Sequence, residues 1–95
     1  MDLKVVDVPE RSRYEASTDG TVVGFCAYHL IDKGVYALPH VEVDPAYEGR
    51  GVGSLLMRES LDHIRERGLK VVPICPFARA YIEKNPSYAD LVHQD

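Results

Sequence analysis

The sequence EGRGVGS, residues 48–54, separates a segment rich in strand signals from a segment with helical periodicity. Its three glycines permit positive φ angles and allow an anion to approach the backbone amides closely. The unpaired N–H groups at the start of a helix, together with the helix dipole, bind phosphate oxygens. Ser54 adds a hydroxyl donor and Arg50 a positive charge, which makes the loop a candidate phosphate site. The alternative is a flexible turn in which the glycines serve only the geometry, because a Gly-rich loop is a weak signal by itself.

Residues after this loop show the 3.6-residue periodicity of an amphipathic helix from about position 51 to 67. Gly68 stands where a left-handed residue would end that helix. Residues 69–75 form a near-continuous apolar run, which is typical of a strand buried on both faces. A short helix is expected over residues 77–84, and Asn85-Pro86 ends it. This order of strand, helix and strand predicts a right-handed parallel crossover.

Residues before the loop carry the signals of antiparallel strands joined by tight turns. Asp19-Gly20 is the strongest hairpin signal, and Asp32-Lys33-Gly34 marks a second turn. β-Branched and aromatic residues predict strands over residues 3–8, 13–17, 21–31 and 35–43. We therefore expect an α+β fold in a single domain of residues 1–95, in which an antiparallel meander precedes a β-α-β crossover and a short C-terminal helix.

The composition narrows the class of protein. Of the 95 residues, 45% are hydrophobic and 27% are charged, which is ordinary for a globular domain. The net charge of −4 and the lack of a lysine or arginine run argue against a nucleic-acid partner. The start of the chain shows no apolar signal segment and no run is long enough to span a membrane, so we expect a cytoplasmic protein without a membrane partner. Cys26 and Cys75 are then reduced, and with four scattered histidines they give no metal-ligand spacing.

Two residues of the predicted strand over 35–43 are candidate acid–base groups. His40 and Glu42 are two positions apart and so face the same side of a strand, and Tyr36 and Leu38 are expected to continue that face. A histidine exchanges protons near neutral pH and is a natural proton acceptor, while a carboxylate orients it or relays a proton through water. The residues alone leave open that His40 is a structural polar group and Glu42 a surface residue.

The two cysteines are expected to differ in role. Cys75 ends the strand over 69–75, where ligands collect in α/β-type crossovers. It is either a nucleophile that carries a transient acyl group or a small residue that lines a pocket. A plain core position is the third alternative, because cysteine is among the most buried residue types. Cys26 lies in the middle of an apolar strand and is assigned to the core.

The glycine-rich loop is not a Walker loop, because no Gly-Lys-Ser/Thr follows it. Its spacing instead resembles the acyl-CoA loop of the GNAT superfamily of N-acetyltransferases, Arg/Gln-x-x-Gly-x-Gly/Ala, although Glu48 departs from the usual first residue. Three blocks in order resemble the very small YjdJ-type GNAT-like family over essentially the whole chain. These blocks are His40-Val41-Glu42-Val43, Gly49-Arg50-Gly51 and Val72-Pro73-Ile74-Cys75-Pro76-Phe77.

This resemblance implies a minimal acetyltransferase fold that binds acetyl-CoA between two splayed strands. It implies catalytic roles for His40, Glu42 and Cys75. It also implies that the backbone of Val41 and Val43 pairs with the pantetheine arm or donates to a developing oxyanion. The further cofactor-binding residues that it implies are Gly49, Arg50, Gly51, Val52, Gly53, Ser54 and Tyr81.

One departure concerns the tyrosine that protonates the leaving thiolate in larger GNAT enzymes. Ile82 holds that position here, and Tyr81 comes one residue early, which rotates its side chain by about 100° on the helix. Two functions therefore remain: an N-acetyltransferase for an unidentified small or peptidic amine, or an acyl-CoA-binding module without efficient turnover. A structural partner protein, in which the loop is only a turn, is a weaker third reading. The sequence predicts neither the acceptor nor the oligomeric state.

Overall fold

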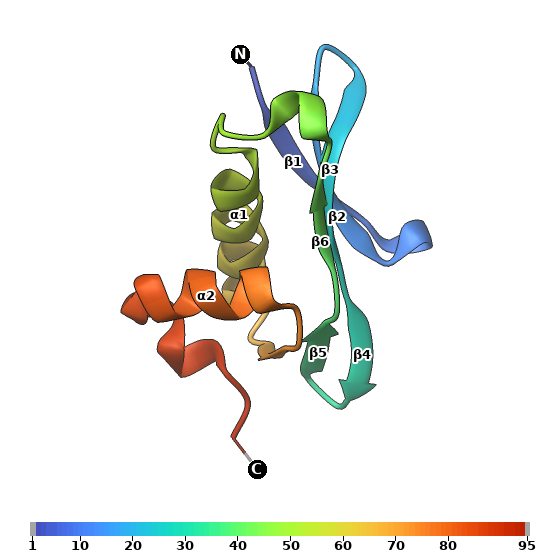
Figure 1. Ribbon diagram of the computed structural model, residues 1–95. Coiled ribbons are helices and arrows are strands. Elements are labelled where there is room, and N and C mark those ends of the chain that lie inside the picture. Colours follow the sequence, from blue (N-terminus) through green and yellow to red (C-terminus); the bar gives the residue numbers. More distant parts are fainter. Residues whose placement is uncertain (1, 95) are drawn as a thin grey trace.

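The strands form two sheets, A and B (Figure 1). The sheets adjoin where two neighbouring stretches of strand are each interrupted. A computed structural model describes residues 2–94 of the chain. Sheet A has the strand order β1-β2-β3-β6, with bounds Lys4–Val8, Arg13–Thr18, Thr21–Ala27 and Val41–Val43. Sheet B has the order β4-β5-β7, with bounds His29–Asp32, Val35–Leu38 and Lys70–Pro73. The α-helices are α1, Val52–Glu66, and α2, Pro76–Lys84, and 3-10 turns occur at Pro9–Arg11, Pro45–Tyr47 and Pro86–Leu91.

Two strands that the sequence predicts as continuous are each broken in the middle. The run 21–31 divides into β3 and β4, and the run 35–43 divides into β5 and β6 at Pro39-His40. Proline has no N–H to give to a ladder and its φ is fixed, so pairing stops there. β5 then pairs in parallel with β7, whereas β6 pairs antiparallel with β3. The prediction of unbroken strands is wrong, and the break leaves β6 at an open edge of sheet A.

The same break changes which side of the sheet the side chains face. Tyr36 and Leu38 are buried in the core, with 8% and 0% of their surface exposed. The side chains of His40 and Glu42 are 57% and 62% exposed. The side chains of β6 that pack against the core are instead those of Val41 and Val43. The expectation that Tyr36 and Leu38 share the face of His40 is therefore wrong, because the alternation of a strand does not carry through the Pro39 break.

The predicted parallel crossover is present. The chain runs from β5 through β6 and α1 to β7, and Val35 and Leu38 of β5 pair with Lys70 and Pro73 of β7. The strand over 69–75 is shorter than predicted and is not buried on both faces, since Lys70 is exposed and Ile74 is 51% exposed. On its outer side β7 meets the C-terminal segment, where the N–H of His93 donates to the carbonyl of Val71 over 2.8 Å.

Helix α1 packs against sheet A and buries one apolar face in the core (Figure 1). It starts within one residue of the predicted position, after Gly51, and Gly68 follows it with a φ of 71°. Leu56, Met57 and Ile64 are fully buried on the predicted apolar stripe. The α+β class is confirmed, and the local periodicity of α1 was sufficient to place its core face. Between residues 2 and 94, no helix is long and apolar enough to cross a membrane.

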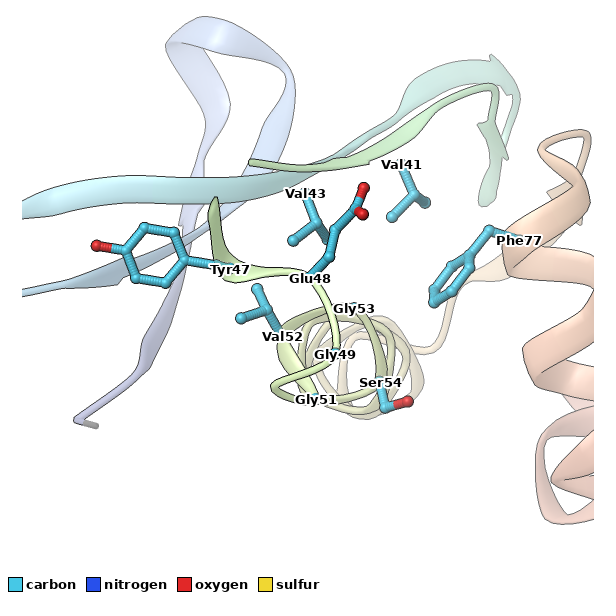
Figure 2. Close-up of a pocket in the computed structure, with 10 residues that line it drawn as sticks. All are labelled: Val41, Val43, Tyr47, Glu48, Gly49, Gly51, Val52, Gly53, Ser54 and Phe77. Carbon is cyan, nitrogen blue, oxygen red and sulfur yellow. The ribbon is translucent and has the colours of Figure 1, made fainter. Parts of the chain in front are cut away.

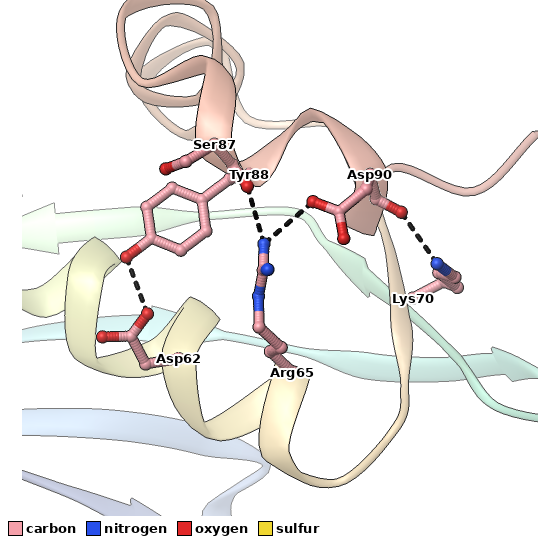
Figure 3. Close-up of polar contacts among 6 residues, drawn as sticks. All are labelled: Asp62, Arg65, Lys70, Ser87, Tyr88 and Asp90. Atoms are coloured by element: carbon pink, nitrogen blue, oxygen red, sulfur yellow. Dashed lines mark hydrogen bonds and ion pairs between the residues drawn. The ribbon is translucent and has the colours of Figure 1, made fainter.

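The C-terminal turn Pro86–Leu91 is fastened to α1 and β7 by polar contacts (Figure 3). The guanidinium of Arg65 donates to the Ser87 carbonyl over 2.7 Å and to Asp90 Oδ1 over 2.9 Å. The ammonium of Lys70 donates to the Asp90 carbonyl over 2.7 Å. The Tyr88 hydroxyl donates to Asp62 over 2.7 Å, and burial, with help from this carboxylate, raises the pKa of Tyr88 to about 12. These contacts hold the segment that follows α2 against α1.

Candidate active site

Strand β6 presents half of its backbone polar groups to an open edge. The N–H of Ala27 donates to the carbonyl of His40, and the N–H of Asp44 donates to the carbonyl of Val23, both over 2.8 Å. Backbone groups of successive residues in a strand point to opposite sides. Those of Val41 and Val43 are therefore directed away from β3, and β6 is the last strand of sheet A. An extended ligand can pair with this edge as an additional strand would.

The start of α1 lies beside that edge. Gly49 and Gly51 have φ angles of 78° and 79°, and a β-carbon at either would meet nothing within 4 Å. The glycines are thus required by the left-handed backbone and not by crowding. The first helical hydrogen bond runs from the N–H of Leu55 to the carbonyl of Gly51 over 3.0 Å. The amides that precede Leu55 have no acceptor within the helix and carry its positive dipole end, which suits an anion.

A pocket of about 430 Å³, the edge pocket, lies between these two features (Figure 2). The side chains of Val41 and Val43 point from β6 toward α1, and the ring of Phe77 closes one end from α2. The pocket thus brings together most of the residues predicted to hold a cofactor and adds three others. Its lining residues are Val41, Val43, Tyr47, Glu48, Gly49, Gly51, Val52, Gly53, Ser54 and Phe77.

Phe77 is a pocket residue that the sequence argument missed. A β-carbon on Gly53 would lie 2.7 Å from Cζ of Phe77, so the ring occupies the space left by the absent side chain. Phe77 is 45% exposed, and its ring lines the edge pocket. Its only local signal was its place directly after Pro76, the first residue of α2.

Two charged residues of the loop differ in their position relative to the edge pocket. The carboxylate of Glu48 points toward β6, between Val41 and Val43 (Figure 2). The guanidinium of Arg50 lies over the ring of Tyr47, 5.7 Å from its centroid. Arg50 is thus held beside the edge pocket and not among its lining residues.

His40 and Glu42 lie on the opposite face of β6. Their Nε2 and Oε1 atoms are 3.8 Å apart. The ring of His40 also packs against Phe25, with the centroids 5.6 Å apart. These residues line a second concavity of about 800 Å³, the outer-face cavity, whose walls include Val41, Val43 and Glu48 of the edge pocket. Its lining residues are Arg13, Val22, Val23, Gly24, Phe25, His40, Val41, Glu42, Val43, Asp44, Pro45 and Glu48.

Cys75 marks the point where the two sheets separate. Its N–H donates to the carbonyl of Leu38 over 3.0 Å, beyond the last paired residues of β5 and β7. From there β6 continues in one direction and α2 in another. We call this point of divergence the apex of the splay, and Cys75 and His40 lie on either side of it. Their environments differ, because Cys75 is 7% exposed within the core whereas the His40 side chain is open to solvent.

The other cysteine is buried in the core, whereas the tyrosine of α2 is half-buried at the border of the core. Burial raises the pKa of the Cys26 thiol to about 12, and the neighbouring Cys75 adds to the shift. Both thiols are free. Tyr81 lies against Tyr88, with ring centroids 6.0 Å apart, and burial raises its pKa. On α2 the residue that reaches the edge pocket is therefore Phe77, while Ile82 is buried in the core.

The site combines an open strand edge, a glycine-rich helix start and two sheets that separate beside them. Comparison with known proteins identifies the family to which this chain belongs. The chain belongs to the GCN5-related N-acetyl-transferase family, whose model matches residues 13–91. It is 35% identical over 66 residues to Protein NATD1 of Gallus gallus, which covers 70% of this chain and 60% of that protein. The chain thus spans less than two thirds of this relative.

Two solved structures resemble the whole or most of the chain. A GCN5-like protein of Staphylococcus aureus superposes with a TM-score of 0.74 and 24% identity, covering 98% of this chain and 90% of that one. A GNAT family acetyltransferase of Brucella melitensis, in complex with acetyl-CoA, superposes with a TM-score of 0.58 and 31% identity. That match covers 73% of this chain and 50% of the other.

Proposed function

We propose that this chain binds acetyl-CoA and transfers its acetyl group to an amine. The observation that carries the proposal is the open edge of β6, which runs from the glycine-rich start of α1 to the apex beside Cys75. Membership of the GCN5-related family and the acetyl-CoA complex of the Brucella melitensis neighbour support the same ligand. We further infer that the chain belongs to the very small YjdJ-type branch of the superfamily.

The residues of the edge pocket suit each part of the cofactor. The amides from Gly51 to Ser54 would hold the pyrophosphate, with the left-handed Gly49 and Gly51 giving it close access. The backbone of Val41 and Val43 would pair with the pantetheine arm along the β6 edge. Phe77 would cover the apolar part of that arm. Arg50, beside the pocket, would add positive charge near the phosphates.

Acetyl-CoA supplies an acetyl thioester, whose carbonyl carbon bonds to the amine nitrogen as the C–S bond breaks. The sulfur leaves as a thiolate, which takes a proton from water to give the thiol. His40 would accept the proton that the amine must lose, because its imidazole is exposed near the apex of the splay. Glu42, 3.8 Å away, would stabilise the imidazolium that results. A backbone N–H of β6 would donate to the oxygen on which negative charge develops.

The burial of Cys75 favours direct transfer over an acetyl-cysteine. The thiol lies in the core at 7% exposure, and a buried thiol in apolar surroundings is a poor nucleophile. On the direct route Cys75 forms no covalent intermediate and serves as a core residue where the two sheets separate. In a covalent route Cys75 would take the acetyl group first, and mass spectrometry would detect the acetylated protein.

The second candidate function is an acyl-CoA-binding module with slow turnover. It is favoured by α2, where Ile82 is buried and Tyr81 lies against Tyr88, so that neither residue lines the edge pocket. For either function we expect the cytoplasm, since buried free thiols such as Cys26 suit a reducing compartment.

A calorimetric titration with acetyl-CoA, followed by a thiol-release assay over a panel of amines, tests this function. We expect one binding site and thiol release that depends on amine concentration. Binding without amine-dependent release would support the binding module. No binding at all would reject both candidates and leave the loop as a structural turn.

A further inference from the structure

We propose that Glu48 sets the affinity of the edge pocket for acetyl-CoA, because its carboxylate stands in the path of the cofactor and must leave before the cofactor pairs with β6. This inference rests on the proposed function. It concerns a residue to which that function assigns no role.

The backbone between β6 and α1 directs the Glu48 side chain into the edge pocket. A 3-10 turn, Pro45–Tyr47, follows β6, and the N–H of Glu48 donates to the carbonyl of Pro45 over 3.3 Å. Gly49 comes next with a φ of 78°. From this turned backbone the Glu48 carboxylate points toward the middle of β6 (Figure 2).

The carboxylate occupies a place that the cofactor would need. In the proposed function, the pantetheine arm pairs with the free backbone groups of Val41 and Val43, and the pyrophosphate binds the amides from Gly51 to Ser54. The Glu48 side chain lies between the start of α1 and this strand edge (Figure 2). A ligand that runs from the one to the other therefore meets Glu48 on its way.

The charge of Glu48 has the wrong sign for this ligand and is not neutralised. Among residues 2–94, no hydrogen bond or ion pair holds its side chain. The cation of the same loop, Arg50, lies over the ring of Tyr47, 5.7 Å from its centroid, and not on Glu48. Like charges a few ångströms apart repel each other even in water. The carboxylate thus disfavours a pyrophosphate that binds beside it.

A second position is available to the side chain. Glu48 lines the outer-face cavity as well as the edge pocket, so rotation of its side chain can move the carboxylate from one to the other. Glu42 and Asp44 also line the outer-face cavity, and their like charge favours the edge-pocket position in the free protein. Only molecules in which the carboxylate has left the edge pocket accept the cofactor, so the apparent affinity falls with their fraction.

Calorimetric titrations of four proteins with acetyl-CoA test this role. Glu48→Gln removes the charge and keeps the length of the side chain, and it should bind roughly fivefold more tightly than wild type, the scale of one exposed charge beside an anion. Glu48→Ala also clears the path and should bind at least as tightly as Glu48→Gln. Glu66→Gln makes the same charge change at the exposed far end of α1 and should leave the affinity unchanged.

An NMR measurement follows the side chain itself. In free wild-type protein, the Glu48 methylene groups should show NOEs to the methyl groups of Val41 or Val43. Saturation with acetyl-CoA should remove these NOEs, because the side chain leaves the edge pocket. NOEs that persist in the saturated protein would overturn the proposal.

The calorimetric results can overturn it as well. Equal binding by Glu48→Gln and wild type would remove the role in affinity, and weaker binding by Glu48→Gln would show that the carboxylate contacts the cofactor favourably. An equal gain in Glu66→Gln would assign the effect to net charge. In all these cases acetyl-CoA still binds, whereas a failure of the proposed function would leave all four proteins without binding and would reject both.

Discussion

A β-carbon on Gly53 would lie 2.7 Å from Cζ of Phe77, so these residues fit together only because position 53 has no side chain. The contact joins the first turn of α1 to the first turn of α2, and both residues line the edge pocket. It therefore sets the width of the pocket at its closed end. Phe77 is 45% exposed, so its ring would move rather than the helices if Gly53 gained a side chain.

The first prediction uses this contact in a double-mutant cycle. Gly53→Ala should weaken acetyl-CoA binding by displacing the Phe77 ring into the pocket. On a Phe77→Ala background, the same substitution should have a much smaller effect, because no ring remains to be displaced. Calorimetry on the four proteins measures the coupling. Additive effects would show that Gly53 acts through its own amide and not through Phe77.

A second prediction separates direct transfer from a covalent route. If the amine attacks directly, Cys75→Ala should keep most activity, and His40→Ala should lose roughly 10²-fold or more, the scale of a positioned general base. If Cys75 carries the acetyl group, Cys75→Ala should be nearly inactive. Intact-protein mass spectrometry with acetyl-CoA and no amine should then show an adduct of about 42 Da, the acetyl mass expected of such an intermediate. A stoichiometric adduct that amine discharges would contradict our preference.

The third prediction concerns acid stability. Burial alone would raise the pKa of Glu15, but hydrogen bonds from Arg13 and Arg11 outweigh it and hold the pKa below its ordinary value. A carboxyl whose pKa is lower in the folded state than in the unfolded state stabilises the fold at pH values above its unfolded-state pKa. This stabilisation is lost as the pH falls through the folded-state pKa. Glu15→Gln should therefore cost about 1–2 kcal/mol of unfolding free energy at neutral pH.

The difference between Glu15→Gln and wild type should shrink as the pH drops below about 4, where the wild-type carboxyl gains its proton. Urea unfolding at several pH values measures this. Glu10→Gln, at a neighbouring exposed position, should show no such pH dependence. A Glu15→Gln cost that is constant from neutral to acid pH would contradict the assignment to the charged pair.

The fourth prediction concerns the core. Leu56 is fully buried on the face of α1 that packs on sheet A, whereas Leu30 of β4 is 67% exposed. Leu56→Ala should cost about 2–5 kcal/mol of unfolding free energy, because it removes buried methyl groups and leaves a cavity. Leu30→Ala should change stability by less than about 0.5 kcal/mol. Similar costs for both in urea unfolding would show that the α1 packing is misassigned.

The sequence predicted the elements whose signals are local. The periodicity of α1 predicted the start of this helix to within one residue, and the glycines of the loop predicted its positive φ angles. The Asp19-Gly20 hairpin was found for the same reason. Such features depend on neighbours in the chain, which a single sequence contains.

The features that were missed depend on contacts between distant segments. Pro39 was a local signal for a break in the strand over 35–43, but only the pairing of β5 with β7 and of β6 with β3 shows that the two halves enter different sheets. Phe77 and Gly53 are 24 positions apart (77 minus 53), and nothing near either residue indicates that they meet. The exposed His40 and buried Cys75 could be named as candidates, but their opposite environments required the folded chain.

The most direct test of the central claim is an amide NMR titration with acetyl-CoA. We expect the largest shifts on Val41 and Val43 of the β6 edge and on residues 49–54 at the start of α1, because the edge pocket lies between these segments. Amides at the far end of α1, up to Arg67 directly after it, should move least. Shifts that centre elsewhere, or no shifts at millimolar acetyl-CoA, would contradict the assignment of this edge and loop to the cofactor.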